Sequence, residues 1–425
     1  MISSEEEIID IEESEISSVT EEDFKEYMDP MSVFGSADIT DRTAFLWQYK
    51  PVPEDEPEPF DEYRFSEKDF ENGRIIAATV RGKKHKHDGT NCDDWFEFDS
   101  SGEWRIMAVS DGAGSRKFSR IGARESCKSA VEFLKEKLAE APDEMREKLS
   151  LPVSDEGFME GCGYFASMLQ DSVQTASKSV SEAFEDRKSK FEYLRLVDRD
   201  LEVKDFSGTF LICIMIPVST AEGKEYFAAA IQIGDGIICS VDRNSDADRA
   251  LRLLSQPDSG NYSGETEFLT SENMTKRETL MGKTKIMRGK SSAVMIMTDG
   301  VADDYFPNSP ELLRLFLDLE LNEIVRISGD GEEAVPDNIP EPLYHPWVNN
   351  NEKIIAVQYA KRISELTGLS LQSLWKNVNL IKKAALGNYE DDLPEKDSEK
   401  LKRWLDSYTE RGSFDDRTLI VCEMW

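Results

Sequence analysis

Several features that mark large classes of protein are scarce or missing in this sequence. Only three of the 425 residues are histidines (His85, His87 and His345), which is too few and too scattered for a histidine-rich zinc site. No apolar run reaches the roughly 18–20 residues that cross a membrane. The first residues also lack a basic patch followed by an apolar core, so we expect no secretory signal and a cytoplasmic location.

Signals for cysteine pairing are missing as well. None of the six cysteines belongs to a Cys-x-x-Cys pair. Several lie in apolar runs, as Cys213 does between Ile212 and Ile214. We therefore expect reduced thiols in the core of a cytosolic protein rather than disulfides.

Positive charge is scarce. The chain has 51 lysines and arginines against 85 aspartates and glutamates, which gives a formal net charge of −34. Residues 1–61 hold 19 acidic and 3 basic residues, a net of −16, so almost half of the excess lies in this short segment. The charge disfavours nucleic acid, which needs a positive surface, and it repels anionic membranes. A phosphoprotein partner is still compatible, because bound cations can reverse the local sign at a site.

The acidic residues divide the chain into two parts. Residues 1–70 are rich in Glu and Asp and include the proline-rich run Pro51–Pro59. Such a segment cannot bury enough apolar surface to offset its ordering entropy, so we predict a mobile extension there. Residues 71–425 then form the folded domain.

Within the domain, short apolar runs predict strands that end at acidic or glycine residues. The runs are 75–80, 104–109, 210–216, 226–233, 237–241, 293–297 and 418–423. The segment Gly234-Asp235-Gly236 predicts a hairpin between two of them. Because no regular alternation of strand and helix appears, we expect antiparallel sheets with helices packed outside, an α+β fold.

Apolar residues at helical spacing predict two long helices after the second strand. They recur every three to four positions from Ala123 to Leu138, with Ser119 placed as the N-cap, and again from Phe165 to Phe184. A further helical stretch is expected over residues 353–410.

Five acidic motifs each adjoin a predicted strand. They are Asp93-Asp94, Asp111-Gly112, Gly234-Asp235-Gly236, Asp299-Gly300 and Asp415-Asp416. Strand interiors usually lack Asp, and a buried carboxylate is costly unless it meets a counter-charge. Together the motifs indicate a shared cation, and oxygen-only ligands suit Mg²⁺ or Mn²⁺. Singly, each has a simpler explanation, because Asp-Gly is a common turn pair and Asp415-Asp416 fits a polar loop.

The order of these motifs resembles that of the protein phosphatase 2C family, the PPM phosphatases. The resemblance covers about residues 74–241 and 291–424 and includes Phe206-Ser-Gly-Thr209 and Met297-Thr-Asp-Gly-Val-Ala-Asp303. The segment from Arg81 through His85 to Asp94 is similar to the Gly-x-x-His … Cys-Gln-Asp motif of a bacterial branch. The resemblance implies a central sandwich of two antiparallel sheets flanked by helices, with a two-metal centre at one edge.

The resemblance also implies roles for the acidic residues. The implied metal ligands are four carboxylates and one backbone carbonyl: Asp94, Asp111, Asp299, Asp415 and Gly112. Asp111 would bridge two Mg²⁺ or Mn²⁺ ions. Asp415 is preferred over Asp416 because the family uses the first residue of that pair. Asp235 matches a position that helps hold a third, weaker ion in some members.

The implied activity is hydrolysis of phosphoserine and phosphothreonine in proteins by a metal-activated water, without a phosphoenzyme. Arg81, His85 and Lys86 are candidates to hold the phosphate, and a solvated basic turn explains each equally well. Many members carry a general-acid His where this chain has Ala113, so the proton must come from His85 or from water. Asp93 replaces a family Gln and adds negative charge near the site.

The main alternative is a phosphatase-like module that binds phosphopeptides or a partner kinase without turnover. The retention of all four implied carboxylate ligands disfavours it. Residues 242–290 fall where the family has a variable flap, and residues 324–410 form a predicted helical insertion; we expect both to govern substrate choice. Family analogy further implies a cognate Ser/Thr kinase as a partner.

Overall fold

The structure is a computed structural model of the chain. It describes residues 49–60, 62–242, 245, 250–255, 266–305, 312–313, 315–316, 319, 324–325, 396–407 and 414–425. Most of the predicted acidic extension and most of the predicted helical insertion lie outside the described residues. No helix in the described part of the chain is long and apolar enough to span a bilayer.

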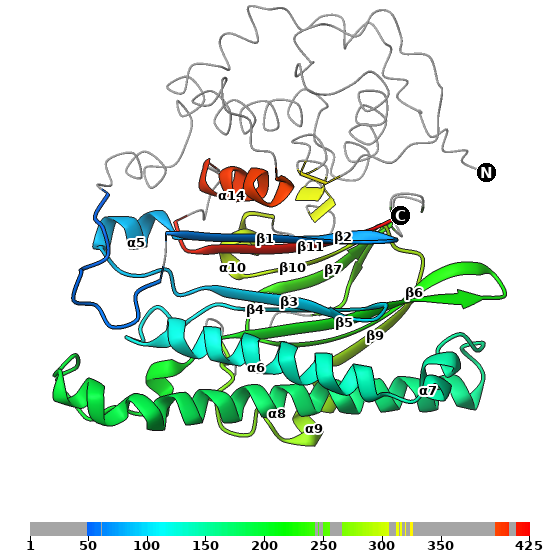
Figure 1. Ribbon diagram of the computed structural model, residues 1–425, viewed down its shortest axis with the longest axis horizontal. Coiled ribbons are helices and arrows are strands. Elements are labelled where there is room, and N and C mark those ends of the chain that lie inside the picture. Colours follow the sequence, from blue (N-terminus) through cyan, green and yellow to red (C-terminus); the bar gives the residue numbers. More distant parts are fainter. Residues whose placement is uncertain are drawn as a thin grey trace, which may run out of the picture.

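Two antiparallel sheets stacked face to face form the centre of the molecule (Figure 1). Sheet A has the order β1 (Tyr63–Phe70), β2 (Gly73–Val80), β11 (Arg417–Met424), β10 (Ala293–Met297), β7 (Ile237–Val241) and β8 (Leu251–Leu253). Sheet B has the order β3 (Trp95–Ser101), β4 (Trp104–Ser110), β5 (Phe210–Thr220), β6 (Gly223–Ile233) and β9 (Thr284–Gly289). This arrangement confirms the predicted α+β sandwich.

The strands read as continuous apolar runs because both faces of each sheet are covered. In β2, Ile75 points into the space between the sheets and Ile76 points to the outer face of sheet A. In β5, Leu211 points inward and Ile212 faces the helices outside sheet B. All six cysteines are free and buried, which confirms the prediction of reduced core thiols.

Helices cover the outer face of each sheet (Figure 1). The long helices α6 (Ser119–Glu140) and α8 (Glu156–Tyr193) pack on sheet B, and α14 (Asp397–Ser407) packs on β1 and β2 of sheet A. Buried Arg74 of β2 pairs with Asp397 and so fastens α14 to the sheet. The short helices are α5 (Lys83–Asp88), α7 (Asp143–Lys148), α9 (Arg277–Lys283) and α10 (Asp299–Ala302).

Two edge strands differ from the sequence prediction. The predicted mobile extension, 1–70, includes β1, which pairs along its whole length with β2, from Tyr63 opposite Val80 to Phe70 opposite Gly73. The prediction is wrong for these residues. At the opposite sheet, β3 was also not predicted. Both strands lie at a sheet edge, where most of their side chains are partly exposed. Neither strand therefore has the continuous run of apolar residues that marks the central strands.

The predicted hairpin at Gly234-Asp235-Gly236 is wrong as well. The strands that flank it belong to different sheets, because β6 pairs with β5 and β9, whereas β7 pairs with β10 and β8. A Cβ atom on Gly236 would lie 2.4 Å from the carbonyl oxygen of Met297, so the glycine allows the chain to cross tightly from sheet B to sheet A. This crossing, rather than a turn, sets the position of Asp235.

The predicted N-cap of the first long helix is also wrong. Ser119 is the first residue of α6, and Phe118 occupies the cap position. The Ser119 hydroxyl donates instead to the carbonyl oxygen of Arg116, 2.9 Å away. The helix therefore begins without a side-chain cap.

Candidate metal centre

Three acidic side chains from both sheets meet at the ends of their strands. Asp111 follows β4 of sheet B, Asp299 begins α10 directly after β10 of sheet A, and Asp235 lies on the connection between the sheets. One carboxylate oxygen from each lies within 4.8 Å of the other two. Because the contributing strands belong to different sheets, the group forms only when the sheets are stacked.

Asp94 lies beside β3 and is completely buried. Its Oδ2 accepts hydrogen bonds from the hydroxyls of Thr298 (2.8 Å) and Thr418 (2.7 Å), but no donor reaches its buried Oδ1. Asp235 is similar, since its Oδ2 accepts from Thr266 at 2.6 Å and its buried Oδ1 has no donor. A buried carboxylate oxygen without a donor is costly unless a cation meets it. We call Asp94, Asp111, Asp235 and Asp299 the carboxylate centre.

The pKa values report the crowding of negative charge in the carboxylate centre. Burial, followed by the charges of Asp299 and Asp94, raises the pKa of Asp111 well above its ordinary value. Burial, followed by the charges of Asp235 and Asp94, does the same to the pKa of Asp299. Burial and then the charge of Asp416 raise the pKa of Asp94 to about 8. A divalent cation would offset this repulsion directly.

Two residues border the centre in different ways. Burial and the charges of Asp235 and Asp415 raise the pKa of Asp303, which no sequence argument assigned to the site. The spacing of Asp303 from Asp299 could have identified it in the sequence, because a residue four positions further on returns to the same side of a helix. Asp415, a predicted ligand, has a side chain 53% exposed and contributes to the raised pKa values of Asp111 and Asp299.

Glycine follows two of these aspartates for a packing reason. A Cβ atom on Gly300 would lie 2.0 Å from the carbonyl oxygen of Asp416, and one on Gly112 would lie 2.6 Å from that of Asp93. The glycines thus let backbone segments from distant parts of the sequence touch beside the carboxylates. A common turn pair does not account for these contacts. The carbonyl of Gly112 stays a predicted ligand.

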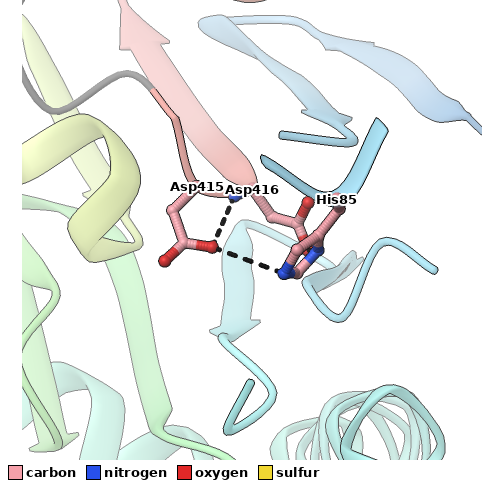
Figure 2. A group of neighbouring side chains, drawn as sticks. All are labelled: His85, Asp415 and Asp416. Carbon is pink, nitrogen blue, oxygen red and sulfur yellow. Dashed lines mark hydrogen bonds and ion pairs between the residues drawn. The ribbon is translucent and has the colours of Figure 1, made fainter. Parts of the chain in front are cut away.

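A second cluster lies beside the first and has the opposite electrostatic character. The buried carboxylate of Asp416 accepts hydrogen bonds from the backbone N–H groups of Gly82 and Asp93, both at 2.6 Å. Its Oδ2 also forms an ion pair of 2.8 Å with Nδ1 of His85, and Figure 2 shows Asp415, Asp416 and His85 gathered here. We call this arrangement the Asp416 clasp, because it joins residue 416 to residues 82–93, more than 300 positions earlier in the chain.

The Asp416 clasp is a poor candidate for a metal site, although its acidic and imidazole atoms lie close enough. Burial alone would lower the pKa of His85, but the charge of Asp416 outweighs it, with smaller contributions from Asp93 and Asp415, and raises the pKa to about 9. A cation would first have to displace the proton from this imidazole. Asp416 therefore has a positional role, and Asp415 stays a predicted ligand.

The remaining basic candidates for phosphate binding are occupied elsewhere. The side chain of Arg81 is fully buried, forms an ion pair with Glu62 and donates to two backbone carbonyl oxygens at 2.8 and 2.9 Å. This placement does not support the prediction that Arg81 holds the phosphate. Lys86 forms an ion pair with Asp406 of α14.

The donor set of the carboxylate centre fits a hard divalent cation. All of its candidate ligand atoms are carboxylate oxygens, the type that Mg²⁺ and Mn²⁺ prefer. Two of the buried oxygens have no donor, and burial and mutual repulsion raise the pKa values. Asp94, Asp111, Asp235 and Asp299 are the residues that would hold such an ion.

Comparison with known families gives one match. Residues 81–326, more than half of the chain, match the protein phosphatase 2C family. The chain belongs to the protein phosphatase 2C family. The segment that matches the family, residues 81–326, contains the whole carboxylate centre and ends before Asp415. A comparison with curated protein sequences gives no match.

Solved structures similar to this protein phosphatase 2C member share little sequence with it. A phosphatase from Toxoplasma gondii is 11% identical, with 85% of this chain and 95% of that chain covered and a TM-score of 0.39. The serine/threonine phosphatase Stp1 from Staphylococcus aureus is 8% identical, with 88% and 100% covered and a TM-score of 0.35. The PPM Ser-Thr phosphatase MsPP from Mycobacterium smegmatis is 14% identical, with 83% and 98% covered and a TM-score of 0.31. The family assignment rests on the match over residues 81–326.

Proposed function

We propose that this protein is a metal-dependent phosphatase that hydrolyses phosphoserine and phosphothreonine in proteins. Membership of a protein phosphatase family supports the class of reaction. One observation carries the metal dependence: Asp111, Asp235 and Asp299 converge within 4.8 Å, beside a buried oxygen of Asp94 that has no donor.

The proposal gives each residue of the site a task. Two Mg²⁺ or Mn²⁺ ions would be held by the four carboxylates of Asp94, Asp111, Asp299 and Asp415. Asp235 would be available to a further ion. Such ions, when bound, lower the pKa of water and offset the charge on phosphoryl oxygens. The hydroxyls of Thr298 and Thr418 orient Asp94. The phosphoryl group passes to water, which gives inorganic phosphate and a free serine or threonine hydroxyl.

The leaving oxygen needs a proton, and two sources are compatible with the geometry. One is His85, whose Nε2 lies 3.8 Å from Oδ1 of Asp415, and the other is water. A series of aryl and alkyl phosphates separates them in the variant His85→Gln. If His85 donates the proton, the loss of kcat grows as the leaving group becomes more basic. An equal loss across the series assigns the proton to water.

The central test measures turnover of para-nitrophenyl phosphate and of a phosphothreonine peptide with Mn²⁺ and with EDTA. We expect metal-dependent release of phosphate that is lost in Asp111→Asn. The matched control is Asp143→Asn, which makes the same change on a side chain of α7 that is 84% exposed. Binding of the phosphopeptide without turnover under any divalent ion would instead favour the non-catalytic module and overturn the proposal.

Substrate choice and partners are further parts of the proposal. The predicted flap, residues 242–290, contacts the centre through the Thr266 hydroxyl on Asp235. We expect Thr266→Val to change kcat/KM for phosphopeptides more than for para-nitrophenyl phosphate, and equal changes would count against this role. The helical insertion 324–410 and a partner Ser/Thr kinase stay proposals from family analogy, and co-purification of the full chain with a kinase would test the latter.

A further inference from the structure

Residues 49–60 form an irregular segment that we call the strap, the dark blue loop beside α5 in Figure 1. It contains four prolines and four acidic residues. The strap leads into β1 and lies against the N-terminal end of α6. Although its composition predicts mobility, charged and aromatic contacts hold it on the surface of the sandwich.

The first of these contacts is Glu56. Its carboxylate pairs with Lys117 at 2.8 Å and with Arg120 at 2.9 Å, and the side chain is only 8% exposed. Arg120 also donates to the backbone carbonyl oxygens of Pro57 (2.6 Å) and Glu58 (3.1 Å). One buried guanidinium therefore holds both a side chain and the main chain of the strap.

The second contact is Glu58, two residues further on. Arg187 of α8 binds its carboxylate in a bidentate manner, with distances of 2.7 and 3.1 Å, and Arg124 of α6 binds it at 2.6 Å. Burial alone would raise the pKa of Glu58, but Arg187 and Arg124 outweigh it and lower the pKa to about 2. The backbone of Glu58 has a φ of 49°, an uncommon value for a residue other than glycine. This uncommon backbone conformation occurs at the residue whose carboxylate meets both arginines.

The strap's other acidic residues behave differently. Glu54 and Asp55 are exposed and make no ion pair with any residue that the structure describes. The cations thus select two carboxylates separated by one residue, out of four in the same segment. The aromatic ring of Phe60 adds an edge contact to Trp95 with the ring centroids 5.1 Å apart.

We propose that Lys117, Arg120, Arg124 and Arg187 form a docking site for an acidic peptide, which the strap occupies in cis. The ligand would be a proline-containing, extended segment with the pattern acid-x-acid, presented by another protein. The four cations lie on one surface and are complementary in charge to such a segment. Of the four, Arg124 and Arg187 also pair with Glu125 of α6, which helps to hold them in place. The proposal does not depend on phosphatase activity.

Tethering makes the strap a strong competitor for this site. A segment joined through a short linker has an effective concentration on the order of millimolar. The strap leaves only a fraction of the sites open. The apparent affinity of a free peptide for the wild-type chain would then be its intrinsic affinity multiplied by that fraction. Weakening the strap should reveal the site, provided that the cations stay in place.

The test uses the full chain and a fluorescein-labelled peptide with the sequence of residues 51–60. The variant E56Q/E58Q removes both paired carboxylates, and the matched control E54Q/D55N removes two unpaired charges from the same strap. We expect E56Q/E58Q to bind the peptide at least about tenfold more tightly than the wild type and the control do. Binding should weaken as salt is raised, because the contacts are ionic.

Two further arms make the result decisive. Adding R124E/R187E to E56Q/E58Q should abolish peptide binding, and circular dichroism of each variant checks that it is folded. A labelled peptide with glutamine at both selected positions should not bind. If E56Q/E58Q, folded, binds the peptide no better than E54Q/D55N does, or if inorganic phosphate alone competes as well as the peptide, the docking proposal is wrong.

Discussion

The carboxylate centre and the Asp416 clasp lie side by side, and they treat negative charge in opposite ways. In the carboxylate centre, Asp94 and Asp235 each keep a buried oxygen without a donor, and burial and repulsion raise the pKa of Asp94 to about 8. In the clasp, two backbone N–H groups and a protonated imidazole compensate Asp416. The contrast separates an acidic group that requires an external cation from one that holds the protein together.

Neighbouring residues show the same contrast. Asp415 and Asp416 are adjacent in the sequence, but the first is exposed toward the centre and the second is buried and paired. A sequence pattern records two aspartates, whereas their roles depend on which donors surround each side chain. The following predictions test this distinction, from the largest expected effect to the smallest.

Asp111→Asn should have opposite effects on activity and on stability. Turnover should fall by more than the roughly 100-fold that loss of an outer partner of a metal ligand can cost. In EDTA the variant should melt at a higher temperature than the wild type, because one source of uncompensated repulsion is gone. Thermal denaturation with and without Mn²⁺ measures the second effect, and a lower melting temperature in EDTA would contradict our view of the centre.

Asp416→Asn should destabilise the fold. The amide cannot accept from both backbone donors and also face the imidazolium, and each buried group left unsatisfied costs about 1–3 kcal/mol. The control Asp415→Asn changes an exposed neighbour and should alter the free energy of unfolding by no more than about 0.5 kcal/mol. Urea denaturation in EDTA compares them, and equal stabilities would remove the distinction between the two aspartates.

Thr298→Val should weaken the site without unfolding the protein. The change removes one of the two hydroxyls that orient Asp94, and loss of such a partner costs about tenfold or more in metal affinity or activity. Calorimetric titration with Mn²⁺ and measurement of kcat/KM would detect it. Thr418→Val removes the other hydroxyl and serves as the comparison; an unchanged affinity in both variants would show that the hydroxyls do not position the ligand.

Glu58→Gln should have a small effect that depends on pH. The pKa of Glu58 in the folded protein, about 2, lies below its ordinary 4.5, so its ion pairs stabilise the fold fully above about pH 4.5. That contribution is lost as the pH falls through about 2. The difference in melting temperature between the wild type and the variant should therefore be full at pH 7, shrink below about pH 4.5 and vanish only as the pH falls through about 2. A constant difference would indicate that Glu58 contributes by packing alone.

Much of the fold could be predicted from the sequence, because central strands buried on both faces leave continuous apolar runs. The runs at 237–241 and 293–297 have the bounds of β7 and β10. The edge strand β1 was missed, since a strand with one open side needs no such run. The hairpin error has a different cause, because a tight crossing between sheets needs the same glycine-rich sequence as a turn between paired strands.

The acidic residues of the centre could be found from their positions after strands, but their surroundings could not. Nothing in the motif marks Thr298 and Thr418 as donors to Asp94, because that contact depends on the register of β10 and β11. Arg81 looked suited to bind phosphate as a basic residue in the first motif. Its partner Glu62 lies in a segment that was predicted to be mobile, so their ion pair could not be anticipated.

The place of β11 in sheet A has a kinetic consequence. This strand lies between β2 and β10, and Glu423 stands opposite Arg74, 349 positions earlier in the chain. During synthesis β2 cannot pair with β11 until residues 417–424 have left the ribosome. Pairing between strands so far apart in the sequence is slow. Thr418 reaches Asp94 only when β11 has entered the sheet. The appearance of full metal affinity should therefore mark one of the last steps of folding.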